Sequence, residues 1–489
     1  MREVELTSVI NASDYGDTDS EADFESTGSS LLGHTSNPRR HGAPKSLRLR
    51  WNDLLQIPWR RHSKADRGAL RTVPPLPVLA CLLFTFLALF ILARAFYPSS
   101  PPPHPFQALS NHCAKNAWRP NLYVNCTLSM GLNNLRSELS QCLKFAFDAG
   151  AGLVLPLIVL RNQESLNAWS NGNPDDTFVE TGFYFDADAL RRDMSAWCPA
   201  LKVVESGELT SLDVREVLDG PRDWWEITFA AGTYRYHVDE VMQKAAVGEP
   251  TPKSPIVIRE PLRPYSVFDY RSWDSSFTYT FFDMIQWAPR LREIGGEVAA
   301  HEKLKEGYIG VHLRLEKDVI PGWAGFDTQT QAYATYINNR PERVIFLACG
   351  DASYKSPFAA LFPHHTIVDK WDLLATLPPA SPSVYSAFLN HSAGVSSVVT
   401  TSPLSLAKSL TFDELGCLDY IPMLNASLVL GIGLSSFAYL LGVERRPRAE
   451  GHFADTLHME LFPEGSSMVG DERTLLLPPI LPEYYDRFP

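Results

Sequence analysis

The chain has 489 residues, a formal net charge of −12 and an apolar content of 45%. This length exceeds what one hydrophobic core usually serves, so we expect two folded domains with accessory segments. The acidic balance excludes nucleic acid as the expected partner of the main body.

Residues 1–75 read as a cytosolic tail. Up to about residue 37 the tail is rich in Ser, Asp, Glu and Gly, and such a composition cannot bury a core, which predicts disorder. From Pro38 to Arg71 the chain then carries ten Lys and Arg residues against Asp53 and Asp66. We therefore expect a basic stretch next to a membrane.

The segment from Val78 to Ala93 has no charged side chain, and with its flanks it reaches the ~20 residues that a bilayer requires. We predict a transmembrane helix over residues 76–97. A buried core helix is the alternative, but such helices usually keep a polar stripe, which this segment lacks. The basic residues before it place the N-terminus in the cytosol and the body in the lumen of the Golgi or endoplasmic reticulum, as a single-pass type II protein.

A Pro-rich stretch at 98–112 predicts an extended stem. Six cysteines follow it, an even number that suits an oxidising compartment but leaves their pairing open. Three sequons are glycosylation candidates if exposed. The cysteines are Cys113, Cys126, Cys142, Cys198, Cys349 and Cys417, and the sequons begin at Asn125, Asn390 and Asn425.

The body alternates between helical and strand patterns. Helical spacing is expected over 132–149, 279–295, 329–338, 419–425 and 435–441, and strands over 153–160, 307–315, 343–348, 366–369 and 428–432. Such alternation predicts an α/β body of two doubly wound, Rossmann-like domains that face each other across a cleft. We place them at 113–285 and 286–489.

Three segments at strand-to-helix junctions carry candidate chemistry. In the first, Gly131 and Asn133 open the helix from Leu132, whose first N–H groups can receive a phosphate or a sugar oxygen. The alternative is an ordinary helix start capped by asparagine.

In the second segment, His312 and Arg314 alternate along a strand and share one face. At the carboxyl end of a strand this face looks into the ligand crevice, where an arginine offers a planar fork for a diphosphate. The alternative is a structural ion pair between Arg314 and Glu316.

In the third segment, Ser435, Ser436 and Phe437 open a helix directly after the strand at 428–432. Hydroxyls and free N–H groups at a helix N-terminus make an anion site, and Phe437 is placed to cover a base. A plain N-cap is the alternative.

Taken together, these segments resemble the GDP-fucose protein O-fucosyltransferase family over residues 125–450. The similar runs are GLNNLR at 131–136, HLRLEKD at 312–318, which is the most specific, and CLDY at 417–420 followed by SSF at 435–437. The resemblance implies a GT-B architecture, with 113–285 on the acceptor side and 286–489 on the nucleotide-sugar side. It also implies an inverting transfer of L-fucose from GDP-fucose to a hydroxyl acceptor, a protein Ser or Thr or a glycan.

By the same resemblance, the catalytic residues are Arg314, which holds the diphosphate, with His312 beside it and Glu316 nearby. Asp419 would bind the guanine or the ribose. Ser435, Ser436 and Phe437 would close over the phosphates and base, with Gly131 and Asn133 on the fucose and acceptor side.

We expect no required metal or other cofactor, because a guanidinium and a helix N-terminus can stabilise a leaving diphosphate. Asp186 and Asp188 therefore read as a capped helix start rather than a metal-binding pair. Some family members have a glutamate where this chain has Met130, so no general base is assigned. Two alternatives stay open: a different nucleotide sugar, and a non-catalytic luminal binding protein.

Overall fold

The structure is a computed structural model of the whole chain. It describes residues 84–87, 106–161, 166, 177–218, 230–259, 280–316, 323–378, 402–433 and 435–445, and five short strands between 448 and 477. The chain divides into two units, Met1–Leu87 and Ala88–Pro489. Everything below concerns the second unit, except for residues 84–87.

The predicted membrane helix at 76–97 lies mostly outside the described residues. Only Phe84–Leu87 is described there; it is helical, and the side chains of Phe84 and Phe86 are exposed. None of the helices in the described ranges has the length and apolar character needed to cross a bilayer. The predicted tail, and the stem at 98–112 up to residue 105, also fall outside these ranges, so all three stay predictions.

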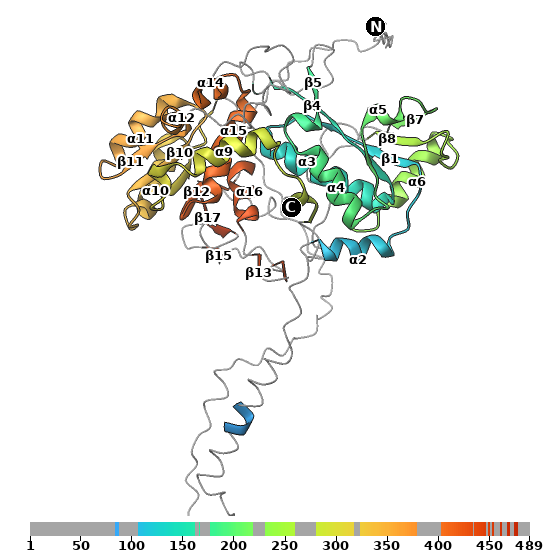
Figure 1. The fold of residues 1–489 in the computed structure, drawn as a ribbon, viewed down its shortest axis with the longest axis horizontal. Coiled ribbons are helices and arrows are strands. Elements are labelled where there is room, and N and C mark those ends of the chain that lie inside the picture. Colours follow the sequence, from blue (N-terminus) through green and yellow to red (C-terminus); the bar gives the residue numbers. More distant parts are fainter. Residues whose placement is uncertain are drawn as a thin grey trace, which may run out of the picture. The chain divides into compact units, whose positions relative to one another are not determined.

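A parallel five-stranded sheet organises the first half of the body, in the order β6-β3-β1-β8-β7. The chain runs outward from β1 to β6 and returns on the other side through β7, so the strand order reverses between β1 and β8. Figure 1 labels β1, β8 and β7 of this sheet. A small sheet, β2-β4-β5, extends from this half. The bounds are β1 (Leu122–Asn125), β2 (Thr127–Leu128), β3 (Gly152–Val154), β4 (Leu157–Val159), β5 (Phe178–Glu180), β6 (Val203–Val204), β7 (Arg215–Leu218) and β8 (Ile256–Arg259).

Helix α3 (Leu132–Ala149) is the centre of this half, since nearly all of its residues are buried. Leu122 and Val124 of β1 share a core with it, whereas Tyr123 points to the other face of the sheet. The helix ends at Gly150, whose φ of 68° suits glycine. The other helices are α2 (Gln107–Lys115), η2 (Thr181–Phe183), α4 (Ala187–Trp197), α5 (Ser206–Leu209), α6 (Tyr234–Lys244) and α8 (Thr280–Met284).

Two disulfides tie this half together. Cys113 of α2 is bonded to Cys198 at the end of α4, and Cys126 after β1 is bonded to Cys142 of α3. Cys349 and Cys417 are free thiols. The six cysteines from Cys113 onward therefore form two disulfide bonds and leave two thiols.

The second half contains a seven-stranded sheet in the order β11-β10-β9-β12-β17-β16-β15. Strands β9 to β12 and β17 are parallel, and β16 and β15 add an antiparallel edge. Here the strand order reverses between β9 and β12. The bounds are β9 (Ile309–His312), β10 (Val344–Ala348), β11 (Thr366–Val368), β12 (Leu428–Ile432), β15 (Glu460–Leu461), β16 (Ser467–Val469) and β17 (Thr474–Leu477), with a separate hairpin of β13 (Arg448–Ala449) and β14 (His452–Phe453).

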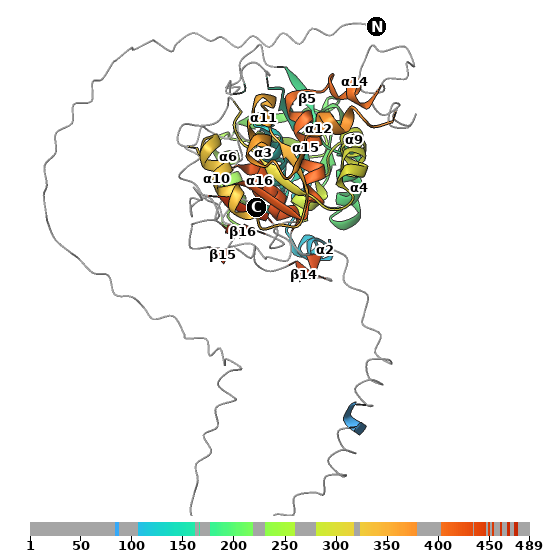
Figure 2. The ribbon, with the colours of Figure 1, turned by 90° about the vertical axis from the view of Figure 1, so that its left-hand side faces the viewer.

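Helices cover both faces of this sheet (Figure 2). Along β10, Ile345 and Leu347 pack with Tyr333 of α10, whereas Phe346 and Ala348 join the core that contains α9 and α15. This alternation is the period of a strand buried on both faces. The helices are α9 (Pro289–Ala299), η4 (Glu302–Leu304), α10 (Phe326–Ile337), η5 (Ala352–Tyr354), α11 (Lys355–Leu361), α12 (Lys370–Leu374), α14 (Pro403–Ala407), α15 (Phe412–Leu424) and α16 (Ser436–Glu444).

The predicted α/β body with parallel sheets is confirmed. Helix α3 and strand β12 have the predicted bounds. The expected strand at 153–160 is wrong as one element, because Pro156 separates β3 from β4, and the expected helix at 279–295 is divided before Pro289. Helix α15 begins at Phe412, well before 419, because Thr411 and Glu414 form a capping box. The GT-B class and the domain boundary at 285 stay predictions.

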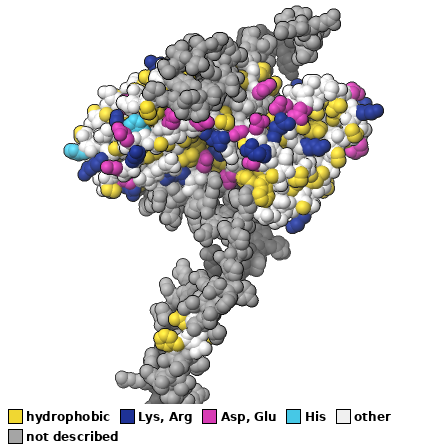
Figure 3. Space-filling model, in the orientation of Figure 1, with side chains coloured by type: hydrophobic (Ala, Val, Ile, Leu, Met, Phe, Trp, Pro, Cys, Tyr) yellow, Lys and Arg dark blue, Asp and Glu magenta, His cyan; other side chains and the backbone are white. Residues whose placement is uncertain are grey.

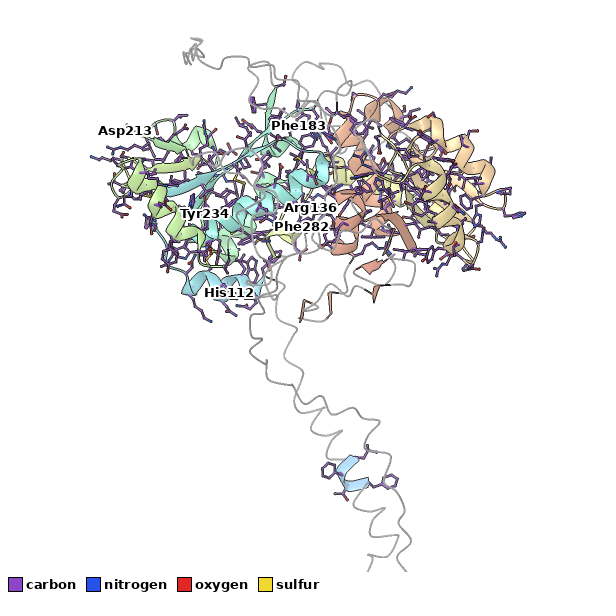
Figure 4. All side chains as sticks on the ribbon, turned by 180° about the vertical axis from the view of Figure 1, so that it is seen from behind. His112, Arg136, Phe183, Asp213, Tyr234 and Phe282 are labelled. Carbon is purple, nitrogen blue, oxygen red and sulfur yellow. A yellow bond between two sulfur atoms is a disulfide. The ribbon has the colours of Figure 1, made fainter. Side chains whose placement is uncertain are left out.

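One buried network joins the two halves. Arg136 of α3, only 3% exposed, pairs with Glu444 of α16 at 2.5 Å and donates from Nε to the carbonyl of Ile285 at 2.9 Å. The Tyr420 hydroxyl of α15 donates to the same Glu444 oxygen at 2.9 Å. Figure 4 labels Arg136 and Phe282, whose ring lies 4.0 Å from the guanidinium carbon. The network binds α3 to α15 and α16.

Charged side chains of both signs are interspersed on the described part of the face seen in Figure 3. Lys and Arg lie beside Asp and Glu there, rather than gathering into a basic stripe of the kind that binds nucleic acid.

Replacing Arg136 with Met should lower the free energy of unfolding by about 3–5 kcal/mol, because it leaves the Glu444 carboxylate mostly buried and unpaired. The double variant Arg136→Met/Glu444→Gln should recover part of this loss. Chemical denaturation measures both. As a control, Arg259→Met breaks the ion pair with Glu216, whose side chains are 45% and 50% exposed, and should cost at most about 1 kcal/mol. Equal losses of unfolding free energy in Arg136→Met and Arg259→Met would contradict a stabilising role of the buried network.

Candidate functional site

The second and third predicted segments meet where the parallel strands of the seven-stranded sheet have their carboxyl ends, which we call the sheet edge below. His312 is the last residue of β9, and Ser435 follows β12, so they flank the point where the strand order reverses. Cys349 and Gly350 follow β10, and Asp369 and Lys370 follow β11. Ligands of open α/β sheets bind outside the carboxyl ends of strands at such a switch point.

His312 and Phe437 bridge this switch point. Their rings stack with centroids 4.4 Å apart and planes 18° from parallel, and Phe437 also meets Tyr420 edge-on at 5.3 Å. His312 is 4% exposed, and among the described residues its Nδ1 has no hydrogen-bond partner. Burial lowers the pKa of His312 to about 4, so at neutral pH the ring is uncharged. It can offer a hydrogen bond to a ligand but no positive charge.

Ser435 occupies the N-cap position of α16 without acting as an ordinary cap. Its side chain is buried and makes no capping hydrogen bond, while its carbonyl accepts from the Tyr439 N–H at 2.9 Å. Ser436 and Phe437 are partly exposed in the first turn. The helix therefore begins without the side-chain cap that the alternative interpretation requires, which keeps the hydroxyl available for another partner.

Both the backbone and the side chain of Arg314 have partners. Its N–H donates to Gln329 Oε1 at 3.2 Å, and Gln329 Nε2 donates back to the Arg314 carbonyl at 2.9 Å. The guanidinium pairs with Glu316, and its carbon lies 5.6 Å from the centre of the Trp323 ring. The Arg314–Glu316 pair, which was the alternative interpretation, is thus present, and the partly exposed guanidinium lies just past the end of β9.

Glu316 is a positioned carboxylate rather than a free base. One oxygen pairs with Arg314, and the other accepts from the Gly350 N–H at 3.0 Å. Burial is the largest single influence and acts to raise its pKa, but the charge and hydrogen bond of Arg314, together with further smaller contributions, hold the pKa of Glu316 below its usual range. The sequence did not single out Gly350, although a glycine directly after a predicted strand was a visible signal. A Cβ at Gly350 would clash with Glu316 Cγ.

Asp419 lies on α15, 6% exposed, with one carboxylate oxygen paired to Lys370. Its Oδ1 has no hydrogen-bond partner within the part of the chain that the structure describes. Burial raises the pKa of Asp419 to about 6, although the charge of Lys370 acts to lower it. Lys370 was not predicted from the sequence.

The N-terminus of α3 binds a carboxylate of the protein itself. The Leu132 N–H donates to Asp413 Oδ1 at 3.1 Å, and Arg161 pairs with the same oxygen at 2.6 Å. Gly131 leaves room for that guanidinium, since a Cβ there would lie 3.0 Å from Arg161 Nη2. Asn133 is 4% exposed, and its Oδ1 has no partner among the described residues. In the described hydrogen bonds and ion pairs, neither Gly131 nor Asn133 is joined to His312 or Arg314.

The predicted capped helix start at Asp186 is confirmed, because its Oδ1 accepts from the Ala189 N–H at 2.9 Å at the beginning of α4. Among the described residues, no cluster of three or more His, Cys, Asp or Glu side chains is suited to a metal ion. Lys317 and Asp318, the last two residues of the HLRLEKD run, lie outside the described ranges.

No protein-family model matches the sequence, and no curated protein matches it. Among solved structures, POFUT1 in complex with GDP-fucose is 14% identical, with 67% of this chain and 96% of that chain covered and a TM-score of 0.39. NodZ α-1,6-fucosyltransferase soaked with GDP-fucose is 14% identical, with coverages of 67% and 92% and a TM-score of 0.32. Fucosyltransferase NodZ from Bradyrhizobium is 15% identical, with coverages of 66% and 92% and a TM-score of 0.30. Similarities this low are not evidence for an activity of this chain.

Replacing Gly350 with Ala should displace the Glu316 side chain, because the added Cβ would overlap Glu316 Cγ. We expect Arg314 to lose its fixed partner and anion binding at this edge to weaken by about tenfold or more, with a stability loss of about 1–3 kcal/mol from overpacking. Titration with pyrophosphate, as a probe of anion binding, and thermal unfolding measure the two effects. Gly296→Ala is the matched control, since its Cβ would meet nothing within 4 Å. Unchanged pyrophosphate affinity in Gly350→Ala would show that Glu316 does not position Arg314.

The buried His312 should make the folded state sensitive to acid. The pKa of His312 is about 4 in the folded chain, against an ordinary value of 6.5, so its contribution to stability is complete above pH 6.5 and is lost as the pH falls towards 4. Relative to His312→Phe, which keeps a stacked ring, the wild type should lose about 1.4 kcal/mol per pH unit in this window. Denaturation at several pH values measures the difference. The control is His364→Gln, which removes an exposed histidine; the unfolding free energy of this variant should depend on pH as that of the wild type does. A pH-independent difference between wild type and His312→Phe would contradict a buried neutral ring.

Proposed function

We propose that this chain is an inverting glycosyltransferase that transfers L-fucose from GDP-fucose to a hydroxyl acceptor, a protein Ser or Thr or a glycan. The observation that carries the proposal is the placement of Arg314. Its guanidinium lies just past β9 and pairs with Glu316, while Gln329 holds the Arg314 backbone, two residues after His312 of the aromatic stack at the switch point. A fixed cation at this position suits a diphosphate.

The chemistry of the transfer supports this role. When the bond between the sugar and the diphosphate breaks, negative charge accumulates on the leaving GDP, and preorganised donors aimed at that charge are the largest catalytic contribution expected. Arg314 would supply a fork of N–H donors, and the Ser436 N–H in the uncapped first turn of α16 would supply a backbone donor, since the Ser435 N–H already donates to the Ile432 carbonyl. The proposal requires no divalent metal. It leaves the general base unassigned.

Recognition of the nucleoside would fall to the remaining residues of this edge. The Oδ1 atom of Asp419 is an acceptor without a partner among the described residues, and guanine presents adjacent N–H donors. The His312–Phe437 pair offers an aromatic surface next to it. Asn133 and Gly131, at the start of α3, would lie towards the fucose and the acceptor.

A luminal setting completes the proposal. The disulfides Cys113–Cys198 and Cys126–Cys142 suit an oxidising compartment, because disulfides rarely persist in the cytosol. The apolar segment at 76–97 would anchor the chain as a type II protein of the Golgi or endoplasmic reticulum, with the Pro-rich stem between it and the enzyme.

The decisive test compares the full-length wild type with Arg314→Ala in an assay of fucose transfer and GDP release. Loss of the guanidinium should lower kcat by about 10²–10³-fold, the usual effect of removing one donor to a developing charge. Arg259→Ala, which removes an exposed arginine of the other sheet, is the control and should retain wild-type activity. Equal activity of wild type and Arg314→Ala would overturn the assignment.

A panel of nucleotides separates the remaining alternatives. GDP at about 100 times its dissociation constant should stabilise the fold by about 2.7 kcal/mol, whereas UDP should not. A preference for UDP would indicate a different donor. Normal GDP binding without turnover of GDP-fucose across acceptors would indicate a binding protein instead of an enzyme.

A further inference from the structure

The Lys370–Asp419 ion pair was not anticipated from the sequence and has no part in the transfer chemistry above. Lys370 is the first residue of α12, directly after β11, and Asp419 lies in the middle of α15. Their side chains are 7% and 9% exposed. The pair therefore lies buried at the same sheet edge as Arg314 and Glu316.

Stability alone does not explain such a pair. Removing two charges from water costs more than their attraction usually returns, and apolar replacements of similar volume are often as stable or more so. In addition, Asp419 Oδ1 lacks a partner among the described residues, and a buried acceptor left unsatisfied costs about 1–3 kcal/mol. A carboxylate with one oxygen bound and the other unsatisfied is arranged for a ligand.

The surroundings of Asp419 oppose its ionisation. The charged and titratable groups that face it are Lys370 and Asp369 from the β11–α12 junction, Glu316 from the end of β9 and Cys349 from the end of β10. Glu316 and Asp369 are acidic and disfavour a further negative charge. Lys370 is the one cation among these groups, so its charge keeps Asp419 available as an anion.

We propose that Lys370 is a positioning residue of the nucleotide site: it holds Asp419 ionised and occupies Oδ2, so that Oδ1 is left to accept an N–H of the bound nucleobase. The role rests on the proposed function, because it concerns the same nucleotide. Lys370 itself touches Asp419 and not the ligand.

The proposal makes nucleotide affinity depend on pH in a defined direction. Asp419 has a raised pKa of about 6, so below that pH it takes up a proton and ceases to be an N–H acceptor at Oδ1. GDP affinity should therefore fall by up to about tenfold per pH unit below pH 6. Without the Lys370 charge the pKa of Asp419 rises further, and the decline begins at higher pH.

The experiment measures the dissociation constant of GDP from pH 5 to 8.5 by calorimetry on the full-length chain. Lys370→Gln keeps a donor for Oδ2 but removes the charge, and we expect it to bind GDP about tenfold more weakly at pH 7, with the acidic decline moved up by about two pH units. Lys370→Arg should restore both values. Lys355→Gln is the matched control, because Lys355 pairs with the neighbouring Asp369 at 2.9 Å and is more exposed. In this variant the loss of GDP affinity should begin at the same pH as in the wild type.

The outcomes separate this inference from the proposed function. If the wild type binds no GDP, the proposed function fails, and the role of Lys370 fails with it. If the wild type binds GDP and Lys370→Gln keeps its affinity and its pH profile, only the inference is overturned. If Lys370→Gln does not fold, the neutral pair Lys370→Gln/Asp419→Asn decides: loss of the acidic decline supports the inference, and its persistence overturns it.

Discussion

The buried cation of Arg136 is the constraint on which the rest of the body depends. A guanidinium at this depth must be fully paired, and its partners come from α16 through Glu444 and from the chain after α8 through the Ile285 carbonyl. Because Tyr420 shares Glu444, the same network sets α15 against α16. Tyr420 then packs edge-on against Phe437, and Phe437 stacks on His312. A charge on α3, in one half, thus orients the aromatic pair at the switch point of the other half.

At the sheet edge, each carboxylate pairs with a cation, and the two cations, Arg314 and Lys370, follow different strands. Arg314 and Glu316 belong to one loop, whereas Lys370 and Asp419 come from α12 and α15. Because the two positive and two negative charges compensate each other, four buried or partly buried charges can lie near one another. If a diphosphate takes Arg314 from Glu316, the carboxylate keeps the Gly350 N–H as a partner. The exchange then costs less than it would if Glu316 were left without any donor.

Local pattern was enough to predict the elements that carry the site, but not the contacts that complete it. The bounds of α3 and β12 follow from apolar spacing and from glycine at the helix end. The partners of the site lie far away in sequence: Gly350 is 34 residues from Glu316, Lys370 is 49 from Asp419, and Asp413 is 281 from Leu132. Spacing along one chain contains no information about such pairs, since they arise only when the sheet brings its strand ends together.

The start of α3 binds an anion, as its sequence predicts, but the anion belongs to the protein itself. A glycine before a helix predicts an anion site, and the Leu132 N–H does bind an anion, but that anion is the Asp413 carboxylate, shared with Arg161. The uncapped start of α16 differs, because Ser435 makes no side-chain cap there. Of the two helix N-termini, one is therefore used to join the halves, and the other begins without a side-chain cap. This division follows from where carboxylates lie in three dimensions, and it is why the proposed function assigns the diphosphate to the ends of β9 and β12 and not to the end of β1.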